Sequence, residues 1–271
     1  MTTREMFRIG DVANLMGLSR DTLRYYEKRG LLDSRKGENG YRYYTRQDIS
    51  RLLGILYQRK MDIALDDIER IWGKGESVSS LSQIMEDRLA EEEAAIRKHR
   101  QTIARLQLTK RDCDNIQNHL DEILLTEPPQ SYVIVPHTDM NSAIPTWFEY
   151  TQKYAGMDMM YIYHEYTWKK NGAGLEISYR NTSLRLNADL VPYVDYDFAA
   201  EPHQVTPAAT CLTTFRTSDR QAPSEADLLP MVRRAEELGL NASQSVYCTF
   251  LTQGLQEGRQ TYYLQLYLPV F

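Results

Sequence analysis

The sequence has few cysteines and no long hydrophobic run, and both absences narrow the classes of protein it can represent. Its three cysteines, Cys113, Cys211 and Cys248, are far apart and form no Cys-x-x-Cys pair, so neither a disulfide framework nor a zinc knuckle is indicated. No stretch approaches the roughly 20 apolar residues that cross a bilayer, and the first residues lack the apolar run of a signal peptide. We therefore expect a cytoplasmic protein with no membrane partner.

Catalytic and metal-binding patterns are also missing. The five histidines are scattered and accompany no Ser-His-Asp set, no Cys-His pair and no cluster of metal ligands. The sequence therefore predicts no catalytic residue, no metal site and no cofactor, and it does not indicate an enzyme. The 271 residues are 42% hydrophobic and 25% charged, which is typical of a folded chain with two modest domains and a connector.

Positive charge is in deficit overall but not at the amino terminus. The net charge is -5, yet residues 1–75 carry 15 Lys and Arg against 11 Asp and Glu, whereas residues 76–127 carry 7 against 11 and residues 128–271 carry 10 against 15. A basic segment on an acidic chain favours a polyanionic partner for that segment alone. We take these three ranges as the domains of the chain.

The first domain begins with two short helices joined by a tight turn. Apolar residues recur at helical spacing over residues 9–16, and Gly17-Leu18-Ser19 then supplies a turn and an N-cap. In the next helix, Arg20, Arg24 and Lys28 fall on one row. Two such helices fit a helix-turn-helix whose second helix enters the major groove of DNA.

A hairpin and two further helices complete this domain. Asn39-Gly40 is a strong hairpin-turn signal before an aromatic strand that begins at Tyr41, and we interpret the hairpin as a basic wing. Thr45, with Asp48 three residues later, predicts the start of the next helix. A short helix follows over residues 65–72.

The middle of the chain predicts a long dimerisation helix. Residues 79–125 contain neither proline nor glycine and are rich in Glu, Arg, Lys, Gln and Leu. A heptad seam runs through Leu89, Ile96, Ile103 and Leu124 at one position and through Met85, Leu106 and Leu120 at the other, although polar residues interrupt it. A rod of roughly 70 Å cannot bury such a seam within one monomer. We therefore expect an antiparallel coiled coil between two copies, that is, a homodimer.

Glu127-Pro128-Pro129 ends the helix, and a different composition follows. The order strand, helix, strand, strand is predicted twice, at residues 131–136, 142–154, 159–168 and 175–180, and again at residues 210–216, 224–238, 245–252 and 261–270. Pro230 predicts that the second helix begins late or bends. The fold class is therefore α+β, with a C-terminal antiparallel α+β domain of two pseudo-repeated halves.

Residues 7–73 resemble the MerR family of bacterial transcription regulators. The resemblance is carried, in order, by Thr22-Leu-Arg-Tyr-Tyr-Glu27, Gly30-Leu-Leu32 and Gly40-Tyr-Arg-Tyr-Tyr44. It implies a winged helix-turn-helix dimer that binds double-stranded promoter DNA with an overlong spacer and distorts it, so that RNA polymerase holoenzyme engages both promoter elements. The DNA-binding residues that it implies are Arg20, Thr22, Arg24, Tyr25, Tyr41, Arg42 and Lys60.

The C-terminal domain resembles, more loosely, the gyrase-inhibitor-like effector domain of the multidrug-sensing, BmrR-like branch of that family. The resemblance rests on the length, the order of the two halves and the closing strand over residues 261–269. It implies an activator that senses lipophilic, cationic aromatic ligands among stacked aromatic rings, with a carboxylate as counter-charge. The candidate effector-binding residues are Trp147, Tyr163, Glu165, Tyr166, Trp168, Tyr179, Phe198 and Tyr247, with Tyr262 as a further aromatic.

Three alternatives stay open at the level of the sequence. In the multidrug branch an acid follows a Val-Tyr pair, but here Cys248 follows Val246-Tyr247, so the effector can also be a neutral metabolite. A metal sensor is the second alternative, although Cys113 and His119 offer too few thiolates for a tight soft-metal site. A small-molecule hydrolase is the third, and no catalytic cluster supports it.

Overall fold

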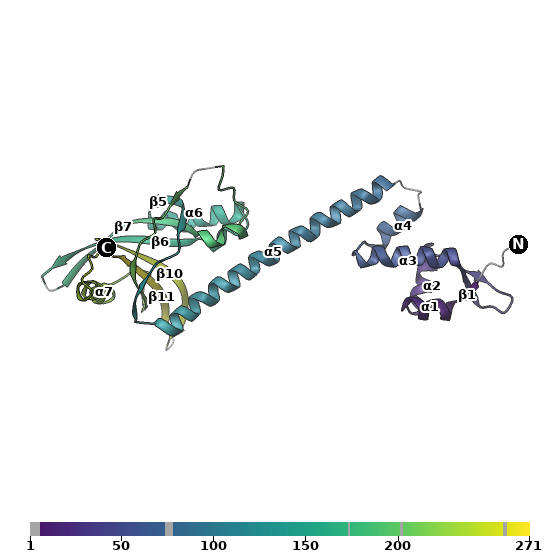
Figure 1. Cartoon of the computed structure of the whole chain (residues 1–271), viewed down its shortest axis with the longest axis horizontal. Helices are drawn as coiled ribbons and strands as arrows, with labels where there is room; N and C mark the ends of the chain where they lie inside the picture. Colours follow the sequence, from purple (N-terminus) through teal and green to yellow (C-terminus); the bar gives the residue numbers. More distant parts are fainter. Residues whose placement is uncertain (1–5, 74–77, 173, 201–202, 257–258) are drawn as a thin grey trace. The chain divides into compact units, whose positions relative to one another are not determined.

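The structure, a computed structural model, describes residues 6–73, 78–172, 174–200, 203–256 and 259–271 (Figure 1). The chain divides into two compact units, Met1–Ala95 and Ile96–Phe271, and each has a core of its own. One helix, α5 (Val78–His119), contributes residues to both units. The domain limit predicted at residues 75 and 76 lies outside the described residues. None of the helices in the described part of the chain combines the length and the apolar character needed to cross a membrane.

The first unit is a small helical domain with a three-stranded antiparallel sheet in the order β1-β3-β2. Its helices enclose a core that includes Leu23, Tyr44, Leu52 and Ile55. The elements that precede α5 are β1 (Met6–Arg8), α1 (Ile9–Met16), α2 (Arg20–Lys28), β2 (Arg35–Lys36), β3 (Arg42–Thr45), α3 (Arg46–Lys60) and α4 (Leu65–Gly73). The predicted helices and the antiparallel pairing of β2 with β3 are therefore present.

Local capping explains where these helices begin and end. Gly17 ends α1 with φ at +66°, a left-handed conformation that a residue with a Cβ adopts at a cost. Two residues later the Ser19 hydroxyl accepts a hydrogen bond from the Thr22 amide at 3.0 Å and starts α2. Thr45 and Asp48 form a reciprocal capping box at the start of α3. The turn between α1 and α2 is thus determined by three consecutive residues, as the sequence predicts.

The second unit is built on one eight-stranded antiparallel sheet in the order β4-β9-β11-β10-β6-β7-β5-β8. The elements are β4 (Ile123–Thr126), β5 (Ser131–Thr138), α6 (Met140–Lys153), η1 (Met157–Met159), β6 (Tyr161–Asn171), β7 (Gly174–Asn187), η2 (Ala188–Tyr193), β8 (Gln204–Val205), β9 (Cys211–Ser218), α7 (Glu225–Glu237), β10 (Ser245–Gln256) and β11 (Arg259–Pro269). Strands β6 and β10, one from each predicted half, pair at its centre. Whether the two halves are equivalent stays a prediction.

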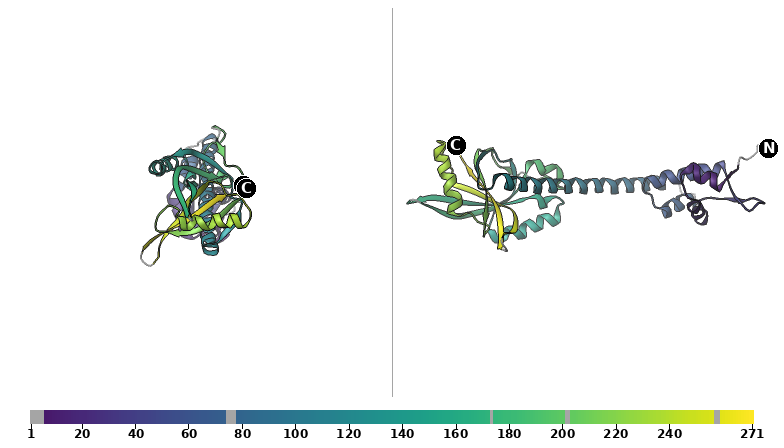
Figure 2. Two further views of the ribbon diagram at one scale, coloured as in Figure 1. Left: turned by 90° about the vertical axis from the view of Figure 1, so that its left-hand side faces the viewer. Right: turned by 90° about the horizontal axis from the view of Figure 1, so that it is seen from below.

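Alternate residues of the central strands face opposite sides of this sheet. On one side, Val246 and Leu266 pack with Leu228 and Met231 of α7 in the main core of the unit. Figure 2 shows α7 alongside the strands at the carboxy-terminal end of the chain. A second cluster joins α6, η1 and η2 to the β5–β7 side of the sheet. The residues between these inward positions, such as Tyr267, face the other way and line the cavity described below.

One expectation about helix limits is wrong, and one of two alternatives for another helix is excluded. The long helix ends at His119 rather than near residue 125, because Asp121 adopts a left-handed φ of +64° and its amide donates to the Phe215 carbonyl at 2.9 Å. Residues 123–126 then form β4, which pairs with β9, so Leu124 is not a heptad position. Helix α7 (Glu225–Glu237) lies within the predicted range and has a capping box at Ser224, so the late start is excluded. The bend at Pro230 stays a prediction.

Helix α5 differs on its two faces. Ala104, Leu108 and Ile116, spaced four and eight residues apart, are buried or half-buried, and the first two pack in a core cluster of the second unit. Four apolar residues of the predicted heptad seam in α5 remain exposed within the single chain, namely Leu89, Ile96, Ile103 and Leu106, whereas Met85 packs against the core of the first unit. Part of α5 is thus covered within its own chain, contrary to the expectation of a rod that has no partner in the monomer, and the four exposed seam residues stay uncovered.

Candidate functional site

The outer face of α2 is the first candidate site. Leu23 and Tyr26 are buried, which leaves Arg20, Arg24 and Lys28 on the exposed side of the same helix. Arg24 donates to Asp21 at 2.9 Å, and both side chains are largely exposed, so this ion pair holds the guanidinium only weakly. The predicted row of cations is thus accessible to a polyanion.

A largely buried carboxylate, that of Glu27, joins α2 to the hairpin. Glu27 accepts a hydrogen bond from the Arg42 guanidinium at 2.8 Å and another from the Tyr44 hydroxyl at 2.5 Å. Burial raises the pKa of Tyr44, and hydrogen bonding to Glu27 raises it further, so the phenol remains a donor. Arg42, which the sequence predicts as a DNA contact, therefore also has a structural partner. We call Glu27, Arg42 and Tyr44 the clamp. The sequence did not reveal it, because Arg42 and Tyr44 follow Glu27 by 15 and 17 residues.

The remaining predicted residues of this unit have different environments. Tyr25 and Tyr41 are exposed at 47% and 59%, and the Tyr25 hydroxyl accepts a hydrogen bond from Arg29 at 3.0 Å. The Thr22 hydroxyl is hydrogen-bonded to the N-cap hydroxyl of Ser19, and Lys60 is exposed at the end of α3. Two exposed cations that were not singled out, Arg35 and Lys36, lie on β2 of the hairpin.

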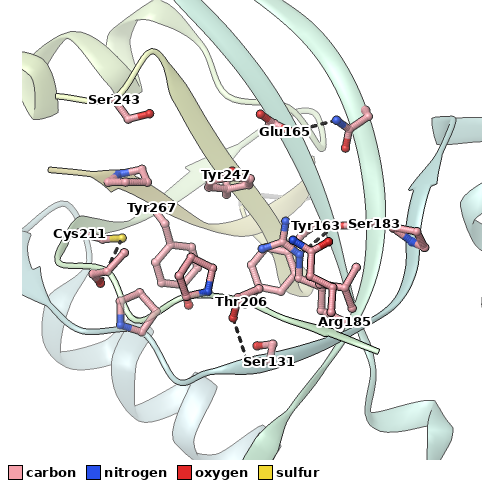
Figure 3. A pocket seen from close by; sticks show the side chains of 18 of the residues that line it. Ser131, Tyr163, Glu165, Ser183, Arg185, Thr206, Cys211, Ser243, Tyr247 and Tyr267 are labelled. Carbon is pink, nitrogen blue, oxygen red and sulfur yellow. Dashed lines mark hydrogen bonds between the residues drawn. The ribbon is translucent and has the colours of Figure 1, made fainter. Parts of the chain in front are cut away.

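The second candidate site is a cavity of about 430 Å³ on the face of the large sheet opposite α7. Its walls come from β5, β6, β7, β9, β10 and β11 and from the segments around Pro128 and Pro207. Figure 3 shows side chains from these elements gathered around one space. A cavity of this size, walled by apolar and aromatic groups together with polar groups and few charges, has the character of a small-molecule site.

Three tyrosines line this cavity, and they are Tyr163, Tyr247 and Tyr267. The ring centroids of Tyr163 and Tyr267 are 6.0 Å apart. Burial raises the pKa of each of the three phenols, so all are protonated near neutral pH and present neutral rings. Tyr267 was not predicted as a site residue, although the alternation along its strand separates it from the core residues Leu266 and Leu268.

Arg185 places a positive charge among these rings. Its guanidinium carbon lies 4.8 Å from the ring centroid of Tyr163 and 4.9 Å from that of Tyr247, within cation-π range of both. Its Nε donates to the Ser183 hydroxyl at 2.8 Å. Arg185 was not among the predicted site residues, because it lies on β7 beyond residue 180, where the strand was predicted to end.

Glu165, the predicted counter-charge, does line the cavity but already has three donors. Its carboxylate accepts hydrogen bonds from Arg180 at 2.7 Å, Ser245 at 2.8 Å and Asn181 at 2.9 Å. Burial alone raises the pKa of Glu165, but these donors outweigh burial and hold the pKa below its ordinary value. The carboxylate is therefore ionised and its charge is balanced by Arg180.

The other predicted effector residues are distributed over separate places. Tyr166 and Trp168 face α7 on the opposite side of the sheet, because they are three residues from Tyr163 and Glu165 on the same strand. Trp147 lines a second cavity, and Phe198 packs against Tyr132 in another cluster. The remaining two aromatic residues, Tyr179 and Tyr262, lie beside Tyr166 and Phe250, respectively. Of the eight predicted residues, the first cavity thus contains Tyr163, Glu165 and Tyr247.

The second cavity, of about 420 Å³, lies between α5, α6 and β6. Trp147 and Phe148 form part of its wall, and the Trp147 indole donates to the Met160 carbonyl at 3.2 Å. Asp112 also lines it and accepts a hydrogen bond from Tyr161 at 2.9 Å, while burial raises its pKa. Within the described residues, no group of three or more His, Cys, Asp or Glu side chains has the arrangement of a metal site.

Comparison with known proteins is clearest for the first unit. The model of the MerR HTH family regulatory proteins matches residues 7–73. The HTH-type transcriptional regulator ZntR of Escherichia coli (strain K12) is 34% identical over 97 residues, which is 34% of this chain and 69% of ZntR. The mercuric resistance operon regulatory protein of Bacillus cereus is 37% identical over 68 residues, which is 25% of this chain and 52% of that protein. The chain thus spans about half to two thirds of these relatives.

A comparison of structures extends over nearly the whole chain. The cryo-EM structure of an EcmrR–DNA complex in EcmrR-RPo aligns with 97% of this chain and 99% of its own, with 18% sequence identity and a TM-score of 0.36. A TM-score of that size does not establish a common arrangement of the whole chain. The sequence matches therefore bear on the first unit, and the second unit is characterised by its own geometry.

Proposed function

Because the chain belongs to the MerR family of transcription regulators, we propose that it is a homodimeric activator whose first unit binds promoter DNA and whose second unit senses a small aromatic molecule. Members of this family are regulators and not enzymes. The observation that carries the proposal is the cationic face of α2, which lies within the residues that the family model matches. A promoter as target places the protein in the cytoplasm.

DNA binding is proposed for α2 and the β2–β3 hairpin. Arg20, Arg24 and Tyr25 lie on the accessible side of α2, where a recognition helix contacts phosphates and base edges. On the hairpin, which we propose as the wing, Tyr41 is exposed and Arg42 is half-exposed. Thr22 and Lys60 complete the proposed interface. The unit has only a modest positive surplus, so affinity depends on two units binding together rather than on bulk charge.

The exposed seam of α5 supports the homodimer. Leu89, Ile96 and Ile103 recur every seven residues and are exposed at 61%, 49% and 53%. Pairing with a second copy as a coiled coil removes this apolar surface from water. Symmetric dimers of helix-turn-helix proteins match the symmetry of palindromic DNA. In the active state we propose that the dimer distorts an overlong promoter spacer and thereby allows RNA polymerase holoenzyme to engage both elements.

The effector site is proposed at the cavity lined by Tyr163, Tyr247 and Tyr267. Its size and its aromatic wall support an aromatic ligand, which stacks on neutral rings and buries apolar surface. Tolerance of many shapes follows from the absence of directional contacts in such stacking. We propose that the chain belongs to the multidrug-sensing branch of the family. Binding of a neutral metabolite or of a metal ion is the alternative result of the experiment below.

The DNA interface is tested by a pair of matched arginines. Arg24 and Arg70 each form an i,i+3 ion pair with an aspartate on a helix of the same unit, and their side chains are 55% and 50% exposed. A binding sequence for the full-length protein is first selected from random duplexes. Arg24→Ala then lowers affinity by about tenfold or more and reduces the slope of log K against log salt by about two per dimer. Arg70→Ala leaves both quantities unchanged, and equal losses in the two variants contradict the proposal.

The effector site is tested by calorimetric titration with aromatic compounds and with Zn²⁺. Tyr247→Ala removes one wall of the proposed cavity, and Trp147→Ala removes one wall of the other. We expect Tyr247→Ala to weaken binding of an aromatic compound by about tenfold or more, since a buried ring contributes about 2 kcal/mol, while Trp147→Ala leaves it intact. The reverse pattern moves the site to the second cavity. If Zn²⁺ releases heat of binding and none of the aromatic compounds does, the result contradicts an aromatic sensor.

A further inference from the structure

The cavity proposed as the effector site contains a positive charge that has no counter-charge in the described part of the chain. Arg185 donates through Nε to a neutral hydroxyl, that of Ser183, and its guanidinium lies against the rings of Tyr163 and Tyr247. No carboxylate of the described residues is within ion-pair distance of it. A half-buried guanidinium whose direct contacts, Ser183, Tyr163 and Tyr247, are all neutral is a group that an anion stabilises.

The carboxylate of the same cavity does not compensate this charge. Glu165 accepts from Arg180, Asn181 and Ser245, and Arg180, the nearest of these donors at 2.7 Å, neutralises it. The pair of Glu165 and Arg180 therefore contributes no net charge, and Arg185 leaves the cavity with a surplus of one positive charge. A lipophilic cation entering this space meets an unpaired guanidinium and a carboxylate that is already bound.

The position of Arg185 also orients a ligand. Its planar guanidinium is held by two ring faces and by one hydrogen bond from Nε, so the terminal nitrogens keep donors for an incoming group. A planar carboxylate matches that fork with two parallel hydrogen bonds. The neighbouring ring of Tyr267, 6.0 Å from that of Tyr163, offers a surface for an aromatic body attached to the carboxylate.

We propose that the effector is an aromatic compound with an anionic head group, a carboxylate in the simplest case, and that Arg185 is the residue that selects for it. This inference rests on the proposed function, because it assumes that the tyrosine-lined cavity is the effector site. It replaces the cationic preference expected from the family resemblance with the opposite one. The physical reason is that the only charge of the cavity left without a partner in the described residues is positive.

The test compares three probes that share one ring system: 2-naphthoate, 2-naphthamide and 2-naphthylmethylammonium. Each is titrated calorimetrically into the full-length protein at one salt concentration. We expect the naphthoate to bind about 10- to 100-fold more tightly than the ammonium probe, which is the range for charge-assisted hydrogen bonds. Arg185→Gln removes this preference and lowers naphthoate affinity by a similar factor, while the affinity for naphthamide changes little.

Two further variants make the result specific. Arg185→Lys keeps the charge but loses the planar fork, so it retains only part of the preference. Arg234→Gln removes one exposed cation of α7, which is paired with Glu237, and leaves the binding of all three probes unchanged. Because naphthamide binding persists in Arg185→Gln, it also reports that the variant is folded.

The outcomes separate this inference from the proposed function. Tighter binding of the ammonium probe than of naphthoate, or an unchanged naphthoate affinity in Arg185→Gln, overturns the anionic preference while the cavity remains an aromatic site. Absence of binding by all three probes, or binding that Tyr247→Ala does not weaken, contradicts the proposed sensor itself and the anionic preference with it.

Discussion

Replacement of Glu27 by alanine should destabilise the first unit far more than replacement of Asp21, although both carboxylates lie on α2 and pair with an arginine at similar distances. Glu27 accepts from Arg42 at 2.8 Å and Asp21 from Arg24 at 2.9 Å. Their environments differ, since the Glu27 side chain is 14% exposed and that of Asp21 is 87% exposed. Burial decides how much of each interaction appears as stability.

The magnitude follows from the groups that lose their acceptor. Glu27→Ala leaves the buried Tyr44 hydroxyl without a partner and frees the half-buried Arg42 guanidinium. An unsatisfied buried donor costs about 1–3 kcal/mol, and Arg42 recovers part of its loss from water, so we expect a total of about 2–4 kcal/mol. Asp21→Ala breaks an exposed pair and should change stability by less than about 0.5 kcal/mol.

Hydrogen exchange measured by mass spectrometry distinguishes the two units within one experiment. Amides of the first unit that exchange by opening of the whole unit should exchange about 30- to 1000-fold faster in Glu27→Ala, since each 1.4 kcal/mol is a factor of ten. Peptides from the second unit serve as the internal control. Tyr44→Phe should cost less in the Glu27→Ala background than in the wild type. Equal exchange in Glu27→Ala and Asp21→Ala would refute the clamp.

The remaining predictions concern the second unit. Gly156→Ala should cost more than about 2 kcal/mol in urea unfolding and Gly239→Ala about 1, because both have positive φ but only at Gly156 does an added Cβ meet backbone, 2.4 Å from a carbonyl oxygen. Burial lowers the pKa of His164, so the unfolded state binds its proton more readily; stability should fall as the pH drops below about 6.5, and His164→Gln should reduce that fall. Iodoacetamide near pH 8 should modify the exposed Cys113 much faster than the buried Cys211, because burial raises the pKa of the Cys211 thiol to about 11. Equal modification rates of the two thiols in a mass-spectrometric time course contradict the buried environment of Cys211.

The first unit was predictable because its signals are local. The turn at Gly17, the N-cap at Ser19 and the capping box of Thr45 each act within three or four residues, and helical spacing alone separates Leu23 from Arg24. The exposed row of cations on α2 follows directly from that spacing. The clamp formed by Glu27 does not, because it requires α2 to meet a strand that the chain reaches many residues later.

The tyrosine-lined cavity was only partly predictable. Strand periodicity could have assigned Tyr163 and Tyr166 to opposite faces, since their positions differ by three and side chains alternate along a strand. No local pattern indicates that Arg185 lies over Tyr247, because β6 separates their strands in the sheet. The order of strands decides which side chains meet, and this order depends on pairing between distant segments.

By itself the sequence determined the helix-turn-helix, the apolar seam of α5 and the alternation of strands and helices beyond residue 130, since capping, turns and hydrophobic periodicity act between near neighbours. Only the tertiary structure decided that α5 ends at His119, that Glu165 is already bound by Arg180, and that the uncompensated charge of the cavity belongs to Arg185. Charge balance within a site depends on every group within a few ångströms, and those groups come from strands that are far apart in the chain.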